Sequence, residues 1–248
     1  MRDTKIERLQ EIIDESRQIV FFGGAGVSTE SNIPDFRSAE GIYHQAYVYS
    51  PEEVVSRSFF LRNPGIFYDF YKEKMLNLDA CPNPAHSKLA ELERARRLIA
   101  VITQNIDGLH QAAGSNRVYE LHGSVHRNYC LKCRKPFSAK YIKNTAGVPH
   151  CTCGGVIKPD VVLYEEGLDD KVIRAAVSKI AEADTLIIGG TSLVVYPAAG
   201  FIDYFSGRHL ILINKSQTAK SVRADLSIEA PIGEVLGQIR VNKSKRED

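Results

Sequence analysis

The segment Ile19-Val20-Phe21-Phe22-Gly23-Gly24-Ala25-Gly26-Val27-Ser28 leads from a short apolar run directly into a glycine-rich turn. An apolar run of this length is typical of a buried strand. The glycines allow the backbone to approach a phosphate closely, and a helix that begins there offers free N–H groups. Thr29 stands where the dinucleotide fingerprint G-x-G-x-x-G has its third glycine. The segment therefore predicts either a nucleotide site or only a tight strand-to-helix turn.

Three further apolar runs have the same character, and they are Leu98–Thr103, Thr185–Ile188 and Leu210–Ile213. Apolar residues also recur at helical spacing in three segments, Lys5–Arg17, His86–Arg97 and Val172–Ala183. Strands that alternate with helices indicate an α/β protein with a doubly wound, Rossmann-like parallel sheet.

Polar residues follow each of the four apolar runs. These loops are Gly23–Ser28, Gln104–His110, Gly189–Ser192 and Asn214–Ser216. Ligands gather at the carboxyl ends of the strands in such sheets. We therefore expect the four loops to meet in one pocket.

Composition narrows the class of protein. The chain has 248 residues, of which 44% are hydrophobic and 25% charged, and this fits one large domain over residues 1–248. Its net charge of +2 is too close to neutral to favour a nucleic-acid partner. No apolar stretch approaches the roughly 18 residues of a membrane span, and the charged N-terminus does not resemble a signal peptide. We therefore expect a cytoplasmic monomer without a nucleic-acid or membrane partner.

Two segments interrupt the alternation of strands and helices. Residues 38–84 fall in an aromatic-rich stretch, and we expect them to form a small helical module beside the cofactor loop. Residues 126–158 contain too few apolar side chains for a core of their own, so we expect a small zinc-ribbon insert that a metal stabilises. Cys81 has no partner in the sequence, and we interpret it as a small buried side chain.

The second insert carries a recognisable metal-binding pattern, C-x2-C-x17-C-x-C, formed by Cys130, Cys133, Cys151 and Cys153. Four thiolates suit tetrahedral zinc, and a site closed by four sulfurs is structural because no position is left for water. Two disulfides or an iron–sulfur cluster are the alternatives. His126 and His150 lie nearby in the sequence, and we interpret them as surface residues.

Two polar motifs lie between the second strand and the cysteines. Asn105 and Asp107 could hydrogen-bond a ligand, or they could cap the next helix. His122 precedes a glycine in a short loop and could act as a general base, because the pKa of histidine lies near neutral pH. A structural role is the alternative for His122.

Taken in order, these motifs resemble the sirtuin family. The matching stretches are Gly24–Ser28, Ile33–Arg37, Gln104–Asp107, His122–Gly123, the four cysteines, Gly190–Ser192 and Asn214–Ser216. The likeness extends from about residue 5 to residue 240, and the ordered set carries it rather than any single motif. Val194–Ala198 and the compact length are most similar to the bacterial and archaeal branch.

The resemblance implies an NAD-dependent protein lysine deacylase with one structural zinc, with NAD as a co-substrate and acylated-lysine proteins or peptides as substrates. His122 and Asn105 would be catalytic, and Val161, Leu163 and Tyr164 would pair with the substrate peptide as an added strand. The residues that would bind the cofactor are Gly24, Ala25, Gly26, Ser28, Thr29, Phe36, Arg37, Gln104, Ile106, Asp107, Gly190, Thr191, Ser192, Asn214 and Ile232.

The resemblance also implies a reaction course. The amide oxygen of the acyl-lysine would attack the ribose C1′ of NAD as nicotinamide leaves. His122 would accept a proton from the ribose hydroxyls, and the acyl group would finish on ADP-ribose.

The chain departs from the family pattern at several positions. Asn32 replaces a glycine, and asparagine tolerates a left-handed backbone. The family's F-G-E reads Tyr164-Glu165-Glu166 here, and we hypothesise that Glu165 favours basic residues around the target lysine. Tyr71 and Lys74 fall near the positions where a desuccinylating branch has Tyr and Arg. We favour their interpretation as exposed helix residues and keep acidic-acyl removal as a minor alternative.

Three other functions deserve comparison. The incomplete glycine motif and the missing ribose-binding acid argue against a dehydrogenase. The near-neutral charge and the large sheet argue against a zinc-ribbon module for nucleic acid. Mono-ADP-ribosylation uses the same cofactor, and the sequence leaves it open.

Overall fold

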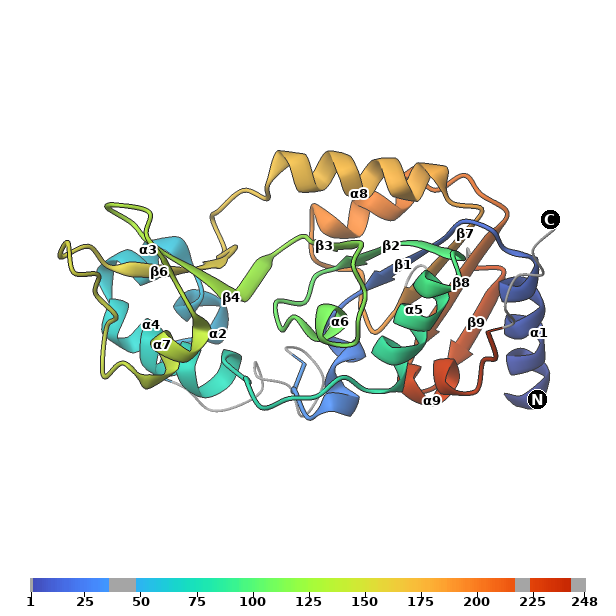
Figure 1. Ribbon diagram of the computed structural model, residues 1–248, viewed down its shortest axis with the longest axis horizontal. Helices are drawn as coiled ribbons and strands as arrows, with labels where there is room; N and C mark the ends of the chain where they lie inside the picture. The colour runs from blue at the N-terminus through green and yellow to red at the C-terminus, as the bar shows by residue number, and fades with distance from the viewer. Residues whose placement is uncertain (1, 36–47, 217–223, 242–248) are drawn as a thin grey trace.

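The computed structural model describes residues 2–35, 48–216 and 224–241. The molecule is elongated and has two lobes, a larger one around a parallel sheet and a smaller one that carries the cysteines (Figure 1). The described helices include none that is long and apolar enough to cross a membrane.

The larger lobe is built on a six-stranded parallel sheet with the order β3-β2-β1-β7-β8-β9. The strands are β1 (Ile19–Gly23), β2 (Leu98–Thr103), β3 (Val118–Glu120), β7 (Thr185–Gly189), β8 (His209–Asn214) and β9 (Leu226–Glu229). The order changes direction at β1, which pairs with β2 on one side and β7 on the other. Ligands bind outside the carboxyl ends of the strands at such a switch point.

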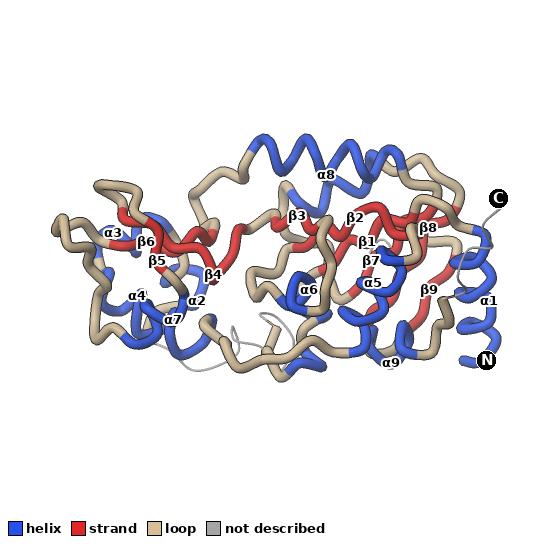
Figure 2. Tube along the Cα trace, viewed as in Figure 1, coloured by secondary structure: helices blue, strands red, loops and turns tan. Residues whose placement is uncertain are grey.

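Helices cover both faces of this sheet, as Figure 2 shows. Ile19 and Phe21 face a core shared with α1 (Arg2–Glu15), α5 (Pro84–Arg94) and α9 (Ile232–Gly237). Val20 and Phe22 face the opposite core, shared with α8 (Asp170–Glu182) and the 3-10 segment η5 (Ala198–Tyr204). Both faces of β1 are therefore buried, which explains its unbroken apolar sequence. The prediction of a doubly wound α/β sheet is confirmed.

The smaller lobe contains a three-stranded sheet of order β5-β4-β6, formed by β4 (Gly123–Cys130), β5 (Pro136–Phe137) and β6 (Ile157–Val161). Its helices are α2 (Pro51–Val54), α3 (Arg57–Arg62), α4 (Pro64–Phe70), the π-helical η4 (Tyr71–Met75) and α7 (Ala139–Asn144). Phe67 and Tyr68 pack in one core with Ile157 and Val161, so the aromatic module and the cysteine-bearing sheet bury each other's apolar side chains.

Tyr71 corrects one expectation from the sequence. It is fully buried, with its ring stacked on Phe67, and is not an exposed helix residue. Other aromatic residues of this stretch, among them Phe59 and Phe60, belong to the same core. The packing between the aromatic module and the cysteine-bearing sheet joins segments far apart in the chain, so local spacing could not indicate it.

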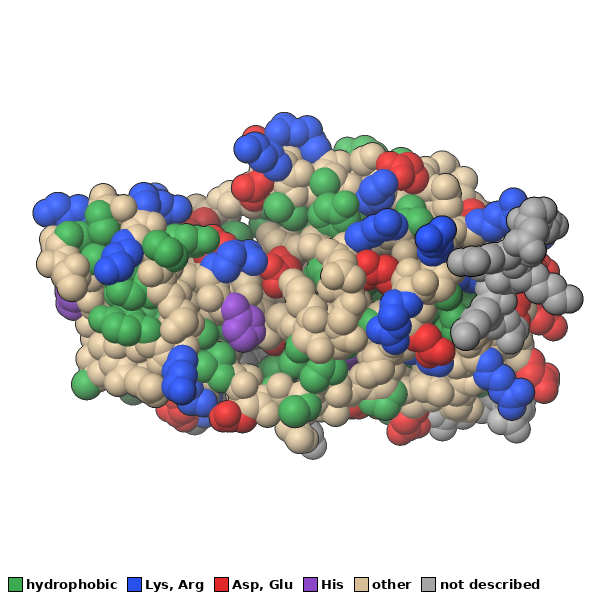
Figure 3. Space-filling model, in the orientation of Figure 1, with side chains coloured by type: hydrophobic (Ala, Val, Ile, Leu, Met, Phe, Trp, Pro, Cys, Tyr) green, Lys and Arg blue, Asp and Glu red, His purple; other side chains and the backbone are tan. Residues whose placement is uncertain are grey.

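Charged side chains are spread over both lobes on the face drawn in Figure 3. Lys and Arg side chains lie at the outer end of the smaller lobe and along α8, interspersed with Asp, Glu and hydrophobic groups.

Candidate functional site

The loops after β1, β2, β7 and β8 meet in a cavity of about 780 Å³, which is in the size range of small-molecule sites. All the site residues expected from the sequence that fall in the described part of the chain, apart from the four cysteines, line this cavity. Phe36 and Arg37, expected to bind the cofactor, lie outside the described residues. The sequence-based prediction of a pocket at the carboxyl edge of the sheet is confirmed.

Glycines let the loops after β1 and β7 touch. Gly26 donates a backbone hydrogen bond to the Gly190 carbonyl at 2.8 Å, and Gly24 donates one to Gly189 at 3.2 Å. A Cβ atom on Gly26 would lie 2.8 Å from the Gly190 Cα, so a side chain there would force the loops apart. Gly190 also has a φ of 59°, a conformation that favours glycine. Because the two loops touch, the backbone of these glycines forms part of the cavity wall.

A buried polar network joins the loops after β1 and β2. Ser28 donates to the Asp107 carboxylate at 2.7 Å, and the Asn105 side chain donates to the Ser28 hydroxyl at 3.0 Å. The other Asp107 oxygen accepts from the backbone N–H of Leu109 at 2.9 Å, at the start of α6 (Leu109–Ala112). Asp107 therefore hydrogen-bonds the first residue of α6 and also holds the cavity wall. Ligand binding by this motif stays a prediction.

His122 lies between β3 and β4, in the strip of chain that joins the two lobes. Its ring Nδ1 is 2.9 Å from the backbone carbonyl of Gln104, and its side chain lines the cavity. A carbonyl only accepts, so Nδ1 carries the proton and Nε2 is the basic nitrogen. Burial lowers the pKa of His122 below its usual value, and the hydrogen bond to Gln104 partly opposes that shift. The ring is therefore neutral at neutral pH and can accept a proton.

The opposite end of the cavity is held by polar contacts around Thr191. Its backbone N–H donates to the Asn214 side chain at 3.0 Å, and the Asn214 amide donates back to the Thr191 carbonyl at 3.0 Å. Gln104 donates to the Thr191 hydroxyl at 3.1 Å, which links this end to the loop after β2. Three loops of the predicted nucleotide site are thus cross-linked.

The beginning of α9 is tied to the loop after β1. Glu30, in the short 3-10 segment η2 (Thr29–Ser31) that follows η1 (Ala25–Val27), accepts a hydrogen bond from the Gly233 N–H at 2.5 Å. The contact places the neighbouring Ile232 at the cavity wall. The link spans more than two hundred residues of sequence.

Lys215 and Ser216 line the cavity, as expected for the loop Asn214–Ser216, and so does Glu165, which was expected to influence peptide preference. The wall also includes residues that sequence reasoning did not assign to the site: Ile33, Pro34, Asp35, Lys74, Met75, Asn77, Val162, Glu166, Leu168, Val194, Val195, Tyr196, Pro197, Ile213 and Ala230. Val194 and Tyr196 are 57% and 71% exposed, although both are large and apolar. Exposed apolar side chains beside a cavity are typical of a surface that receives a partner. The sequence signal that could have indicated this part of the wall is the apolar run that follows Ser192, after β7.

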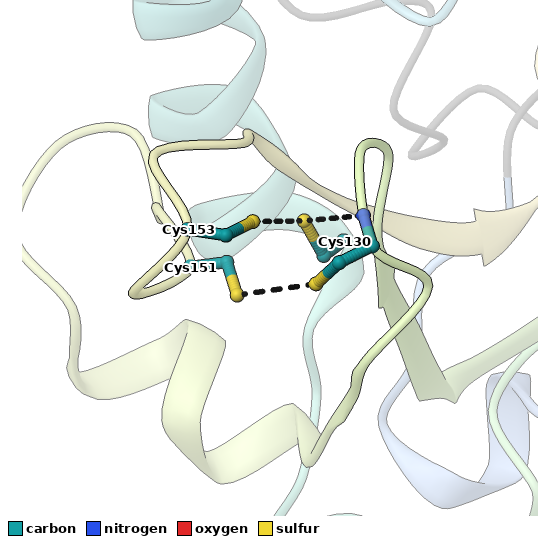
Figure 4. A group of neighbouring side chains, drawn as sticks. Cys130, Cys151 and Cys153 are labelled. Carbon is teal, nitrogen blue, oxygen red and sulfur yellow. Dashed lines mark hydrogen bonds between the residues drawn. The ribbon is translucent and has the colours of Figure 1, made fainter.

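The four clustered cysteines bring their sulfur atoms within 4.8 Å of one another. Cys130 Sγ lies 3.5 Å from Cys153 Sγ, as Figure 4 shows with a dashed line. Cys133 Sγ lies 3.6 Å from Cys151 Sγ. Zinc–sulfur bonds of about 2.3 Å imply sulfur–sulfur distances of about 3.8 Å in a tetrahedron, so the cluster fits the ion.

Backbone N–H groups favour the thiolate form of one cysteine in the cluster. The N–H groups of Cys133 and Lys132 point at Cys130 Sγ, at 3.5 and 3.4 Å, and hold the pKa of that thiol down at about 6. His126 and His150 are exposed and hydrogen-bond backbone carbonyls, as surface histidines do. Cys81 is exposed, so its interpretation as a buried side chain was wrong.

Comparison with known proteins agrees with this geometry. Residues 24–197 match the model of the Sir2 family. The chain is 59% identical over 241 residues to an NAD-dependent protein deacetylase of Clostridium perfringens, covering 96% of this chain and 99% of the relative. It is 60% identical over 236 residues to an NAD-dependent protein deacetylase of Clostridium acetobutylicum, covering 94% and 96%.

Solved structures give the same result. A Sir2 variant with a deacetylated p53 peptide and 3′-O-acetyl ADP-ribose has a TM-score of 0.87 and 38% identity, covering 93% of this chain and 95% of that one. A Sir2 protein bound to acetylated peptide has a TM-score of 0.81 and 37% identity, with the same coverage.

Proposed function

The chain belongs to the Sir2 family and is an NAD-dependent protein deacetylase, and we propose that it uses His122 as general base to pass the acyl group of a lysine to ADP-ribose. The observation that carries the proposal is the hydrogen bond between His122 Nδ1 and the Gln104 carbonyl, inside a cavity that the glycine-rich loop also lines. This contact fixes the tautomer and the direction of the ring that a base requires.

The cavity residues divide into groups that suit the parts of NAD. Bound NAD supplies a ribose carbon from which the positively charged nicotinamide leaves readily. The loop Gly24–Thr29 lines the cavity with backbone groups that suit phosphates. The Thr191 hydroxyl and the Asn214 side chain, held by their mutual hydrogen bonds, line it where the ribose is proposed to bind. Asn105 and Asp107, held by Ser28, face the reacting end together with Gln104 and Ile106. His122 Nε2 is the atom that receives the proton of a ribose hydroxyl.

The substrate peptide is expected to pair with the segment after β6. Within the described part of the chain, the N–H groups of Val162, Leu163 and Tyr164 are taken by His122, Glu166 and Val55. Among the described residues, none bonds the Val162 carbonyl or the backbone N–H of Glu165, and both residues line the cavity. We therefore expect a peptide to pair through these two groups, with side chains of Val161, Leu163 and Tyr164 forming the wall beside it.

The proposed zinc is structural and takes no part in proton transfer. The four sulfurs use all the positions of a tetrahedral ion, and such closed sites are structural. The clustered thiols also favour a reducing compartment, so a cytoplasmic location is part of the proposal.

Removal of acidic acyl groups is a second candidate activity, favoured by one observation. Lys74 lines the cavity and its side chain is 24% exposed, so its ammonium could meet a carboxylate. It also pairs with Glu73 at 2.8 Å, which partly satisfies its charge. Acetyl groups remain the proposed substrate, and the acidic acyl groups are to be compared with them directly.

Mass spectrometry of peptides tests the proposal. An acetyl-lysine peptide and the matching succinyl-lysine peptide are incubated with the protein, with and without NAD. The proposal predicts loss of the acetyl group only when NAD is present, with the succinyl peptide changing more slowly. An acetyl peptide left intact in the presence of NAD, or deacetylated without it, contradicts the proposal.

A further inference from the structure

Glu165 occupies a backbone conformation that favours glycine. Its φ is 74°, in the left-handed region, and it stands where sirtuins usually have the glycine of F-G-E. A side chain is strained there, so a non-glycine residue persists only where other contacts hold it. The same residue carries one of the two backbone groups proposed to pair with the substrate peptide.

The carboxylate of Glu165 is held by a single residue of the helical module. One oxygen accepts from the backbone N–H of Ser58 at 2.9 Å, and the other accepts from the Ser58 hydroxyl at 2.9 Å. Both oxygens are therefore engaged within the protein. These contacts orient the carboxylate, and the variants below separate this role from recognition of basic residues in the substrate.

Two backbone hydrogen bonds flank this contact. Tyr164 donates to the Val55 carbonyl at 3.0 Å, and Arg57 donates to the Tyr164 carbonyl at 3.0 Å, in a short parallel bridge. The bridge holds Tyr164, and a turn spans Tyr164 and Glu165, closed by the Glu166 N–H, which donates to the Leu163 carbonyl at 3.0 Å. The Ser58–Glu165 contact adds a restraint on the side chain of the residue whose φ is strained.

We propose that Ser58 and Glu165 form a clamp that holds the peptide-pairing backbone of Glu165 in place before the acylated substrate binds. The inference rests on the proposed function, and it makes both residues positioning residues. An edge fixed in advance loses less conformational entropy when the substrate docks. The clamp should therefore act on the affinity for the peptide and leave NAD binding and proton transfer alone.

Three variants separate a geometric clamp from a direct charge effect. In Ser58→Ala and Glu165→Ala the clamp is broken, and we expect KM for an acetyl-lysine peptide to rise about threefold or more, with KM for NAD and kcat changed less than twofold. Glu165→Gln removes the charge but can still accept from the Ser58 N–H and donate to its hydroxyl. We expect this variant to stay near the wild-type KM.

A matched control lies on α8, far from the cavity. Ser178 donates to the Glu182 carboxylate at 2.8 Å, and neither residue lines the cavity, so Ser178→Ala should leave the peptide KM unchanged. Peptide affinity is measured as well, by fluorescence anisotropy with an acetylated peptide. If the wild-type protein binds the peptide but does not deacetylate it, only the proposed function is contradicted. The clamp is then tested by comparing the peptide affinities of the wild-type protein and the variants.

Several results would overturn the clamp. One is an unchanged peptide KM and affinity in Ser58→Ala, and another is a wild-type protein that does not bind the peptide at all. A third is a Glu165→Gln variant that loses affinity only for peptides with basic flanking residues. That last result would assign Glu165 to direct recognition of the substrate's charge.

Discussion

His122 and Gln104 are joined by a hydrogen bond of 2.9 Å between the imidazole Nδ1 and the main-chain carbonyl. The bond links the strip between β3 and β4 to the loop after β2, so the ring is oriented by backbone that the central sheet holds. An imidazole oriented in this way presents one nitrogen to the cavity in its neutral form.

Removal of that imidazole should stop the reaction without unfolding the protein. We expect His122→Ala to lower kcat about 100-fold or more, which is the usual contribution of a positioned general base. Steady-state rates and thermal unfolding curves measured together check this. His150→Ala, at an exposed histidine, is the control and should keep wild-type activity. Comparable rates for His122→Ala and the wild-type protein would remove His122 from its proposed role.

A buried histidine pair should make the fold sensitive to acid. His86 and His110 pack with ring centroids 4.7 Å apart, and burial lowers their pKa values to about 4 and about 3. Unfolded histidines titrate near 6.5, so the unfolded chain binds more protons between these values. The contribution of these neutral rings to the free energy of unfolding is fully present above about pH 6.5 and is lost as the pH falls towards 4.

Substitution of one member tests this pH dependence. His110→Phe keeps an aromatic ring beside Phe21 and removes one titrating group, so its stability should decline less steeply in acid than that of the wild-type protein. Urea unfolding at several pH values between 4 and 7 measures the difference. Release of zinc in acid affects both proteins equally. Parallel curves for the two proteins would show that the pair does not control acid stability.

Removal of zinc should destabilise the smaller lobe. Cys130 and Cys151 lie in the core shared by the aromatic module and the three-stranded sheet, so loss of the ion affects both. We expect one zinc per chain by elemental analysis, and a lower Tm together with lost activity after chelation, both restored by added zinc. Cys130→Ser should behave like the chelated protein, whereas Cys81→Ser should match the wild type. Full activity and an unchanged Tm in metal-free protein would contradict a structural zinc.

Two glycines offer a contrast between a crowded and an open position. Gly123, next to His122, has a φ of 75°, and a Cβ atom there would lie 1.8 Å from the Asp160 carbonyl. We expect Gly123→Ala to destabilise the fold by at least about 2 kcal/mol because of the strained φ and the clash. Gly65 in α4 has nothing within 4 Å of an added Cβ, so Gly65→Ala should be neutral or slightly stabilising. Denaturant unfolding compares the two, and equal stabilities would contradict the prediction.

The sequence predicted the buried strands well because their cause is local. Leu98–Thr103 was predicted with the bounds that β2 has, since every position in it is apolar or ends the strand. The edge strands Val118–Glu120 and Leu226–Glu229 were not predicted. They are short and partly polar, and they exist because a neighbouring strand offers its backbone groups.

Features of the site that depend on tertiary contacts could not be predicted from the sequence. The motif order indicated the family, and the sheet brings the described residues of those motifs into one cavity. The bond between His122 and the Gln104 carbonyl could not be inferred, because a main-chain acceptor leaves no mark on side-chain identity. The engagement of Glu165 by Ser58 joins residues 107 positions apart, so no local pattern indicated that this carboxylate is occupied.

The fate of the acyl group tests the central claim most directly. A peptide carrying an isotopically labelled acetyl-lysine is incubated with the protein and NAD, and the products are separated and quantified by mass spectrometry. We expect the label to appear in O-acetyl-ADP-ribose, in an amount equal to the nicotinamide released and the lysine freed. Label recovered as acetate without release of nicotinamide, or ADP-ribose attached to a peptide that keeps its acetyl group, would contradict it.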